Sequence, residues 1–251
     1  MKTVLTIAGS DSGGGAGIQA DIKTAEAHGV FAASAITALT AQNTQGVAGV
    51  LGVKTEFIIK QIETVLSDFD ISAVKIGMLG NYETANALAD ILKNFGKPIV
   101  LDPVAISRAG SKLLDDDAKT ALTKLFTLAD IVTPNHFEAE YFGLCTNTDA
   151  KLPKCNFLIK NIFPDSAVAV DRLFLKGSFA RDYETPFAQK ANTHGSGCTY
   201  SMAITCNLAL GFTLDDAIQN SKNYIYNAIK NAPDLGHGNG PIRHKTQTAC
   251  E

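Results

Sequence analysis

Short apolar segments alternate with amphipathic segments along almost the whole chain, and this alternation limits the fold more than any other feature. The strand-like segments are rich in β-branched residues and apolar on both faces, as buried parallel strands are. We predict strands at Val4–Ile7, Phe31–Thr37, Ala73–Ile76, Ile99–Leu101, Ile131–Thr133, Phe157–Ile159 and Leu173–Leu175. This alternation predicts an α/β fold in which a mostly parallel central sheet carries helices on both faces.

The segments between these strands show the apolar period of amphipathic helices. In the helix predicted at Thr55–Ser67, the apolar face consists of Phe57, Ile58, Ile62, Val65 and Leu66. The other predicted helices are Tyr82–Phe95, Asp115–Leu128, Thr199–Leu210 and Leu214–Asn231. No proline-rich linker, low-complexity run or internal repeat divides residues 1–251, so we expect a single domain.

Composition and charge exclude several classes of protein. Hydrophobic residues make up 45% and charged residues 19% of the chain, which is typical of a globular protein and not of a disordered one. The net charge of −3 offers no basic surface for nucleic acid or an anionic membrane. No apolar run approaches the roughly 18 residues of a membrane span. The five cysteines lack C-x-x-C spacing, which argues against a disulfide framework or zinc site and indicates the reducing cytoplasm.

A glycine-rich loop, Ala8-Gly-Ser-Asp-Ser-Gly-Gly-Gly-Ala-Gly17, follows the first predicted strand and opens a helix. It lacks the Gly-Lys-Ser/Thr of a P-loop. It partly fits a dinucleotide-binding fingerprint, but the acidic residue expected about 20 positions later is missing from Ala38–Thr44. Two interpretations stay open: a tight turn in which the glycines only supply unusual backbone angles, and a loop that also lines a small-molecule pocket. The position beyond a strand end favours the pocket.

A second glycine-rich segment, Asn192-Thr-His-Gly-Ser-Gly-Cys-Thr199, precedes a helix rich in small residues. The glycines allow several backbone N–H groups to point at one spot, and the helix dipole adds about half a positive charge there. Such an anion hole stabilises the charge on a transferring phosphoryl group. Cys198 lies in the first turn, where a thiol pKa falls below its usual ~8.5, so that a thiolate could accept a proton from an attacking hydroxyl. The alternative is an inert small residue at a tight helix start.

Together these segments resemble the ribokinase-like small-molecule kinases, and in particular the hydroxymethylpyrimidine and phosphomethylpyrimidine kinases of thiamine biosynthesis. The matching motifs, in the family's order, are Ala8–Lys23, Ile36–Thr44, Lys75–Leu79, Leu101–Val104, Thr133–Asn135, Thr193–Thr199 and Gly236–Pro241. The resemblance implies a ribokinase-like fold and a kinase that uses ATP and Mg²⁺. Its substrates would be 4-amino-5-hydroxymethyl-2-methylpyrimidine and then the monophosphate of that pyrimidine. A homodimer is expected from the resemblance alone.

The resemblance also implies the site residues. The pyrimidine pocket maps to Gly9, Asp21, Gln42, Met78 and Val104. The amide of Gln42 can both donate to and accept from an aminopyrimidine edge. Phosphoryl transfer maps to Gly195, Ser196, Gly197 and Cys198, where Cys198 takes the place of the aspartate base of other ribokinase-like enzymes. The nucleotide maps to Asn135, Lys160 and Thr193, and Mg²⁺ maps to Asp102 and Glu138.

The chain departs from the family where Lys-Gly-Gly-His is usual. Lys160 and Lys176 compete for the place of that lysine, and only Lys160 leaves room for a hairpin before His194, so we assign the role to Lys160. Asn161-Ile-Phe then replaces Gly-Gly-His, and a Cβ there narrows the approach to phosphate. Arg108 is either a ligand of a phosphorylated substrate or a solvated loop residue.

Two other functions stay open from the sequence. A pyridoxal kinase of the same superfamily would need the pocket around Gln42 and Met78 to accept a pyridine aldehyde. A non-catalytic pyrimidine-binding protein is suggested by Asn161-Ile-Phe and by the short connection from Asn135 to Lys160. Retention of Cys198 and of the whole anion-hole motif favours the enzyme.

Overall fold

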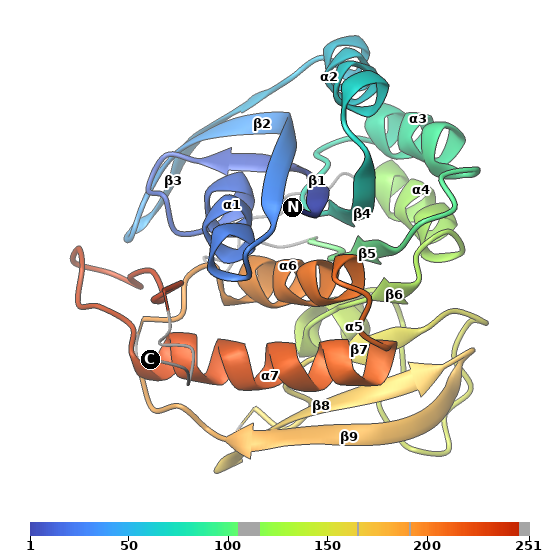
Figure 1. Cartoon of the computed structure of the whole chain (residues 1–251). Coiled ribbons are helices and arrows are strands. Elements are labelled where there is room, and N and C mark those ends of the chain that lie inside the picture. The colour runs from blue at the N-terminus through green and yellow to red at the C-terminus, as the bar shows by residue number, and fades with distance from the viewer. Residues whose placement is uncertain (105–115, 165, 191, 246–251) are drawn as a thin grey trace.

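The computed structural model describes residues 1–104, 116–164, 166–190 and 192–245, and these residues form one nine-stranded sheet (Figure 1). The strands lie in the order β3-β2-β1-β4-β5-β6-β7-β8-β9. Their bounds are Thr3–Asp11 (β1), Phe31–Asn43 (β2), Gly46–Gly52 (β3), Ile71–Ile76 (β4), Ile99–Leu101 (β5), Ile131–Val132 (β6), Phe157–Ile159 (β7), Val168–Leu175 (β8) and Ser178–Pro186 (β9). Strands β2, β1, β4, β5, β6 and β7 pair in parallel, whereas β3, β8 and β9 are antiparallel additions at the two edges. The predicted mostly parallel sheet is confirmed.

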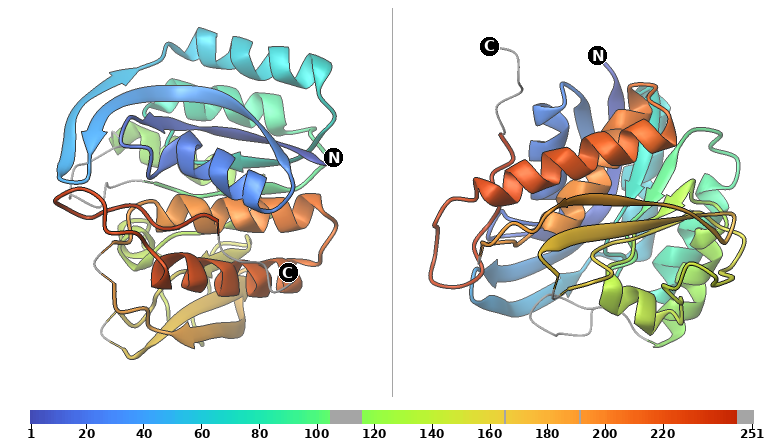
Figure 2. Two further views of the ribbon diagram at one scale, coloured as in Figure 1. Left: turned by 60° about the vertical axis from the view of Figure 1, so that its left-hand side comes forward. Right: turned by 90° about the horizontal axis from the view of Figure 1, so that it is seen from below.

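Helices cover both faces of this sheet, as predicted (Figures 1 and 2). One face carries α1 (Gly17–Ala27), α6 (Ser196–Ala209) and α7 (Leu214–Lys230). The other face carries α2 (Thr55–Asp68), α3 (Tyr82–Leu92), α4 (Asp116–Phe126) and the short α5 (His136–Tyr141). Apolar clusters pack against both faces of the sheet. One, which includes Ile62 and Leu88, lies under the layer of α2 to α5. Two others, which include Ile204 and Met202 respectively, lie under the layer of α1, α6 and α7.

The sequence missed the two antiparallel edge strands β3 and β9. Most of β3 is exposed, and three of its seven residues are glycine, so no buried apolar run marks it. Strand β9 reads SFARDYETP, and only Tyr183 and Thr185 are buried in it. An edge strand with one solvated face carries a much weaker apolar signal than a central parallel strand.

Helix α2 buries a narrower face than its apolar period predicts. Ile58 and Ile62 are 1% and 0% exposed, and Val65 and Leu66 pack partly against the same core. Phe57 is 58% exposed, so its predicted place on the buried face is wrong. A step of one residue turns the helix by about 100°, which moves Phe57 away from the line through Ile58 and Ile62.

This difference predicts unequal effects of two truncations on the same helix. Ile62→Ala is expected to lower the free energy of unfolding by about 2–5 kcal/mol, because the deleted atoms leave a cavity in the core. Phe57→Ala deletes a larger side chain but is expected to cost less than about 1 kcal/mol, because most of the ring lies in water. Urea unfolding followed by circular dichroism measures both. Equal losses would contradict the assignment of the buried face.

The parallel strands end at one edge of the sheet, and this edge positions the polar residues of the cavity described next. Asp11 ends β1, Asp102 follows β5, and Lys160 follows β7. Ligands of open α/β sheets bind beyond such carboxyl ends. No helix of the described residues is long and apolar enough to cross a membrane.

Candidate active site

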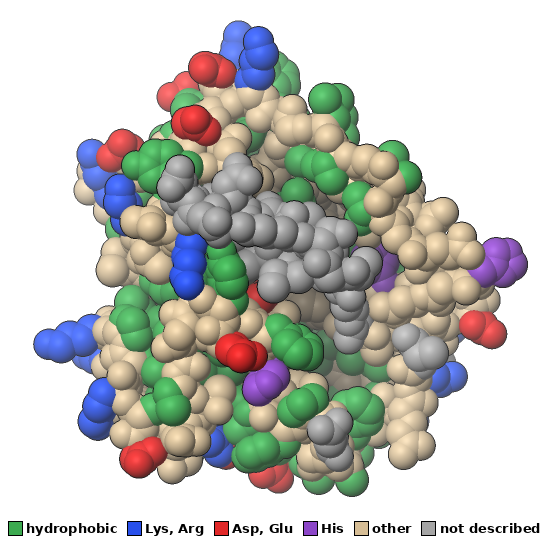
Figure 3. Space-filling model, turned by 180° about the vertical axis from the view of Figure 1, so that it is seen from behind, with side chains coloured by type: hydrophobic (Ala, Val, Ile, Leu, Met, Phe, Trp, Pro, Cys, Tyr) green, Lys and Arg blue, Asp and Glu red, His purple; other side chains and the backbone are tan. Residues whose placement is uncertain are grey.

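A cavity of about 690 Å³ lies beyond the carboxyl ends of the parallel strands, and Figure 3 shows a hollow in the face seen from behind. Its volume suits a small molecule together with a larger cosubstrate. All but one of the predicted site residues line this cavity: Gly9, Gln42, Met78, Asp102, Val104, Asn135, Glu138, Lys160, Thr193, Gly195, Ser196, Gly197 and Cys198. The exception is Asp21. Arg108 lies outside the described residues.

The two ends of the cavity differ in chemistry. Beyond strands β2, β4 and β5, the amide of Gln42 and the apolar side chains of Met78 and Val104 form a small lining that suits one aromatic ring. At the β7–β9 end, a larger apolar lining suits a nucleobase; it is formed by Phe137, Phe187, Ala188, Ile225, Tyr226 and Ile229. Between these ends lies the first turn of α6. Two molecules, one bound at each end, would therefore meet at the N-terminus of this helix.

Helix α6 begins where the two glycine-rich loops touch. Gly195 has a left-handed backbone with φ of 80°, and a Cβ on it would overlap the carbonyl oxygen of Gly15. Only glycine allows this approach. The N–H of Ser196 donates to the carbonyl of Thr193 at 3.2 Å. The first-turn N–H groups of Gly197 and Cys198 have no acceptor within the helix, so they are candidate anion donors within the predicted run from residue 195 to residue 198.

Lys160 and Asp102 form an ion pair in the wall of the cavity. Lys160 Nζ lies 2.8 Å from Asp102 Oδ1, and the two residues are 8% and 2% exposed. Burial alone would raise the pKa of Asp102, but the charges of Lys160 and Lys75 hold it below its ordinary value. Burial would likewise lower the pKa of Lys160, but Asp102 and then Glu138 raise it. Lys160 is therefore a fixed cation in the cavity wall, whereas Lys176 is exposed in the turn between β8 and β9.

Asp21 lies behind the cavity wall, which corrects the expectation that it contacts the pyrimidine. It is 0% exposed on the inner face of α1, and its carboxylate accepts from Lys75 at 2.9 Å and from Thr6 at 2.6 Å. Lys75 is also fully buried, and the charge of Asp21 raises its pKa against the effect of burial. Lys75 begins one of the motifs found in the sequence, Lys75–Leu79, but no role was predicted for it. The pair holds a second cation under the site, close enough to Cys198 to act on its pKa.

The thiol of Cys198 is protonated at neutral pH, contrary to the expectation of an acidic thiol. Burial raises its pKa to about 11, and the charge of Lys75 offsets only part of this effect. Asp21 and Asp102 raise it further. A helix N-terminus lowers a thiol pKa where the thiolate is solvated, but here desolvation dominates.

Asn135 and Glu138 form a capping box at the start of α5. The side chain of Asn135 accepts the Glu138 N–H at 2.9 Å, and the Glu138 carboxylate accepts the Asn135 N–H at 2.8 Å. Glu138 is 3% exposed and lies on the same side of the cavity as Lys160. Its carboxylate and that of Asp102 are the hard oxygen ligands that Mg²⁺ prefers, and Mg²⁺ takes one or two protein carboxylates when phosphates and water supply the rest. The donor set fits this ion.

Asn161 has a left-handed backbone with φ of 50°, at the position where the resemblance described above leads us to expect glycine. Asn tolerates this conformation better than other residues with a Cβ. The N–H of Asn161 donates to Asp171 at 2.8 Å, and Asp171 also pairs with Lys222 at 2.7 Å; both partners of this pair are nearly buried. The substitution is therefore accommodated by local conformation and by one hydrogen bond, and the loop still lines the cavity.

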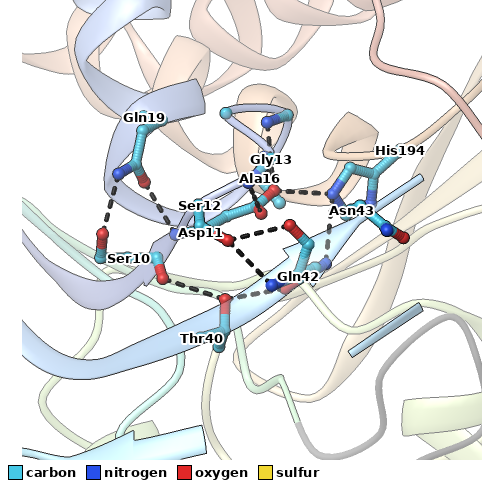
Figure 4. Close-up of polar contacts among 12 residues, drawn as sticks. Ser10, Asp11, Ser12, Gly13, Ala16, Gln19, Thr40, Gln42, Asn43 and His194 are labelled. Atoms are coloured by element: carbon cyan, nitrogen blue, oxygen red, sulfur yellow. Dashed lines mark hydrogen bonds and ion pairs between the residues drawn. The ribbon is translucent and has the colours of Figure 1, made fainter. Parts of the chain in front are cut away.

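Several residues that organise the site lie in the motifs of the sequence but had no predicted role. The tail loop after α7 holds the segment before α6, because Asn239 accepts the Thr193 N–H at 2.8 Å and Asn192 accepts the Gly240 N–H at 2.9 Å. Asp11 and His194 form another link, between the first glycine-rich loop and α6 (Figure 4). Such contacts join residues up to 183 positions apart, which no local pattern encodes.

The fold and the cavity define a ribokinase-like phosphotransferase. The family model described as phosphomethylpyrimidine kinase matches residues 11–243. The hydroxymethylpyrimidine/phosphomethylpyrimidine kinase of Haemophilus influenzae is 42% identical over an alignment of 261 positions that covers 97% of each chain. The crystal structure of phosphomethylpyrimidine kinase from Clostridium difficile covers 92% of this chain and 100% of its own, with 42% identity and a TM-score of 0.77. An ADP complex of Bacillus subtilis pyridoxal kinase covers 97% of both chains, with 31% identity and a TM-score of 0.85.

The chain belongs to the phosphomethylpyrimidine kinase family. The family, the ribokinase-like fold and the kinase activity predicted from the sequence are thus confirmed.

The backbone at Asn161 generates a prediction about stability. Asn161→Gly is expected to leave the free energy of unfolding unchanged or raise it, because glycine adopts positive φ freely. Asn161→Ala is expected to lower it by about 1 kcal/mol, since an alanine has no such freedom. Urea unfolding of both variants and the KM for ATP of the glycine variant are the measurements. An alanine variant as stable as the glycine variant would show that φ at this position carries no strain.

Proposed function

We propose that this chain is a single kinase domain that transfers the γ-phosphoryl group of ATP to 4-amino-5-hydroxymethyl-2-methylpyrimidine and then to its monophosphate, in thiamine biosynthesis. The observation that supports this most directly is the position of the α6 N-terminus. It lies between the small cavity end at Gln42 and the larger end beside Lys160. A hydroxyl bound at one end and a nucleotide bound at the other meet at the N–H groups of Gly197 and Cys198.

In the proposed mechanism the protein mainly positions the reactants and stabilises charge, because phosphoryl transfer passes through a loose transition state. Gln42 holds the pyrimidine edge while Met78 and Val104 contact the ring faces. The N–H groups of Gly197 and Cys198 and the cation of Lys160 stabilise the negative charge of the transferring group. Cys198 takes the proton of the hydroxyl as a thiolate, which a pKa of about 11 makes a minor form at neutral pH.

Magnesium completes the nucleotide end. Glu138 and Asp102 would hold it, and Asp102 would do so while paired with Lys160 at 2.8 Å. When bound, the ion neutralises charge on the nucleotide phosphates. Asn135 and Thr193 would line the path of these phosphates.

The test of the function is the mass of the product formed from the hydroxymethylpyrimidine, ATP and Mg²⁺. We expect the monophosphate first and the diphosphate later. Pyridoxal is assayed in parallel, because pyridoxal kinase from Bacillus subtilis shares this fold over 97% of both chains. Phosphorylation of pyridoxal alone would support a pyridoxal kinase. Pyrimidine binding without any phosphorylated product would support a non-catalytic binding protein.

The role of Cys198 predicts a specific pH dependence. Below its pKa of about 11 the thiolate fraction rises about tenfold per pH unit, so the single-turnover rate should rise in the same way from pH 7 to pH 9. Cys198→Ala should lower this rate by about 10²-fold with little change in pyrimidine affinity. Cys198→Asp, whose carboxylate is already ionised, should flatten the profile. A flat profile of the wild type, or an undiminished rate of the alanine variant, would contradict a thiolate base.

We place the chain in the cytoplasm as a homodimer. The dimer proposal rests on exposed apolar side chains of the β2–β3 ribbon. Leu39 is 45% exposed, its cross-strand partner Leu51 is 65% exposed, and the neighbouring Val50 is 52% exposed.

Lysine, arginine and acidic side chains are dispersed over the face in Figure 3, which suits a small-molecule enzyme better than a nucleic-acid-binding protein.

A further inference from the structure

Four side chains form a continuous polar chain at the pyrimidine end of the cavity (Figure 4). His194 Nε2 lies 2.8 Å from Asp11 Oδ2 and 3.3 Å from the amide nitrogen of Gln42. The amide oxygen of Gln42 lies 3.0 Å from the hydroxyl of Thr40. That hydroxyl also lies 3.0 Å from the carbonyl oxygen of Ser10. The chain therefore runs from the first glycine-rich loop through the segment before α6 to the end of β2.

Asp11 fixes the proton at one end of this chain. It is 3% exposed, and its carboxylate accepts the N–H groups of Gly13, Gly15 and Ala16. Burial alone would raise the pKa of Asp11, but the hydrogen bond with His194 and the N–H groups of Gly13 and Ala16 hold it below its ordinary value. A carboxylate can only accept, so Nε2 of His194 carries a proton and donates it, whatever the state of Nδ1.

This proton determines which way the Gln42 amide is turned. A protonated Nε2 of His194 cannot pair with an amide NH₂ group, because both are donors. Thr40 raises a second conflict, since its one hydroxyl proton faces two acceptors, Ser10 and Gln42. The oxygen and nitrogen of an amide are interchangeable in shape. Exchanging them removes the conflict at Thr40 and replaces the donor–donor contact at His194 with one N–H shared between two acceptors. The Nε2 proton of His194 then bonds mainly to Asp11 at 2.8 Å and is shared with the amide oxygen of Gln42 at 3.3 Å. The amide nitrogen of Gln42 donates to Thr40, and Thr40 donates to Ser10.

We propose that Asp11 and His194 are positioning residues that hold the Gln42 carboxamide with its oxygen towards His194 and its nitrogen towards Thr40. The inference rests on the proposed function. A 4-aminopyrimidine accepts at ring N3 and donates from its 4-amino group, so it pairs with this amide only when the amino group lies on the His194 side. The neighbouring 5-hydroxymethyl group then lies on that side too, towards Gly197 and its N–H group. The opposite amide orientation would turn the hydroxymethyl group away from α6.

The 4-oxo analogue of the substrate tests this orientation, because its edge is reversed: N3 donates and the 4-oxygen accepts. The wild type should prefer the amino compound in kcat/KM by about 10²-fold or more. His194→Phe removes the proton that holds the amide and should reduce this preference by about tenfold or more. His194→Gln, which keeps an N–H at that place, should retain it within about threefold. His237→Phe, in the exposed tail loop, is the matched control and should retain it fully.

An unchanged preference in His194→Phe would overturn the proposal. So would a ¹⁵N NMR spectrum of the wild type in which Nε2 of His194 carries no proton, a result that does not depend on how any variant folds. A wild type that turns over neither compound would contradict the proposed function instead, and the NMR measurement would still decide the state of His194.

Discussion

The close contact between the two glycine-rich loops is the constraint on which the rest of the site depends. Gly195 fits against the carbonyl of Gly15 only because it has no Cβ, and its left-handed backbone starts α6 at that point. The contact brings the end of β1 and the start of α6 together across 180 residues of sequence. Because of it, the Gln42 lining and the first-turn N–H groups face a single cavity.

Charge at this site comes from local pairing and not from the net charge of the protein. The chain carries −3 overall, yet Lys75 and Lys160, two of its buried lysines, lie close enough to Cys198 to interact with its charge, and each is held by one aspartate. Removing either aspartate would leave an unpaired buried cation, which is far more costly than the pair itself. The pairs therefore keep cations close to the place where phosphate charge develops, without a basic surface. The Lys75–Asp21 pair also explains how Asp21, which lies in the first glycine-rich motif, can influence the pKa of Cys198 without contacting a ligand.

The sequence predicted those parts of the structure that follow from local pattern. Central strands such as β4 and β7 are apolar on both faces, and the glycine-rich segments have distinctive spacing, so both were found. Strand β9 was missed because only one of its faces is buried. The protonated state of Cys198 could not be predicted, since the helix start alone favours a low pKa and only the three-dimensional packing shows the stronger effect of burial. Likewise, residue 161 keeps the glycine-like conformation without glycine, which the backbone shows and the residue type does not.

The most direct test of this account is a structure of the protein with the hydroxymethylpyrimidine and a non-hydrolysable ATP analogue bound together. The account predicts the pyrimidine on Gln42, the γ-phosphoryl group at the N–H groups of Gly197 and Cys198, and the substrate hydroxyl between them, within about 3.5 Å of the γ-phosphorus. A pyrimidine whose hydroxymethyl group points away from α6, or a nucleotide bound outside the end lined by Lys160, would contradict it.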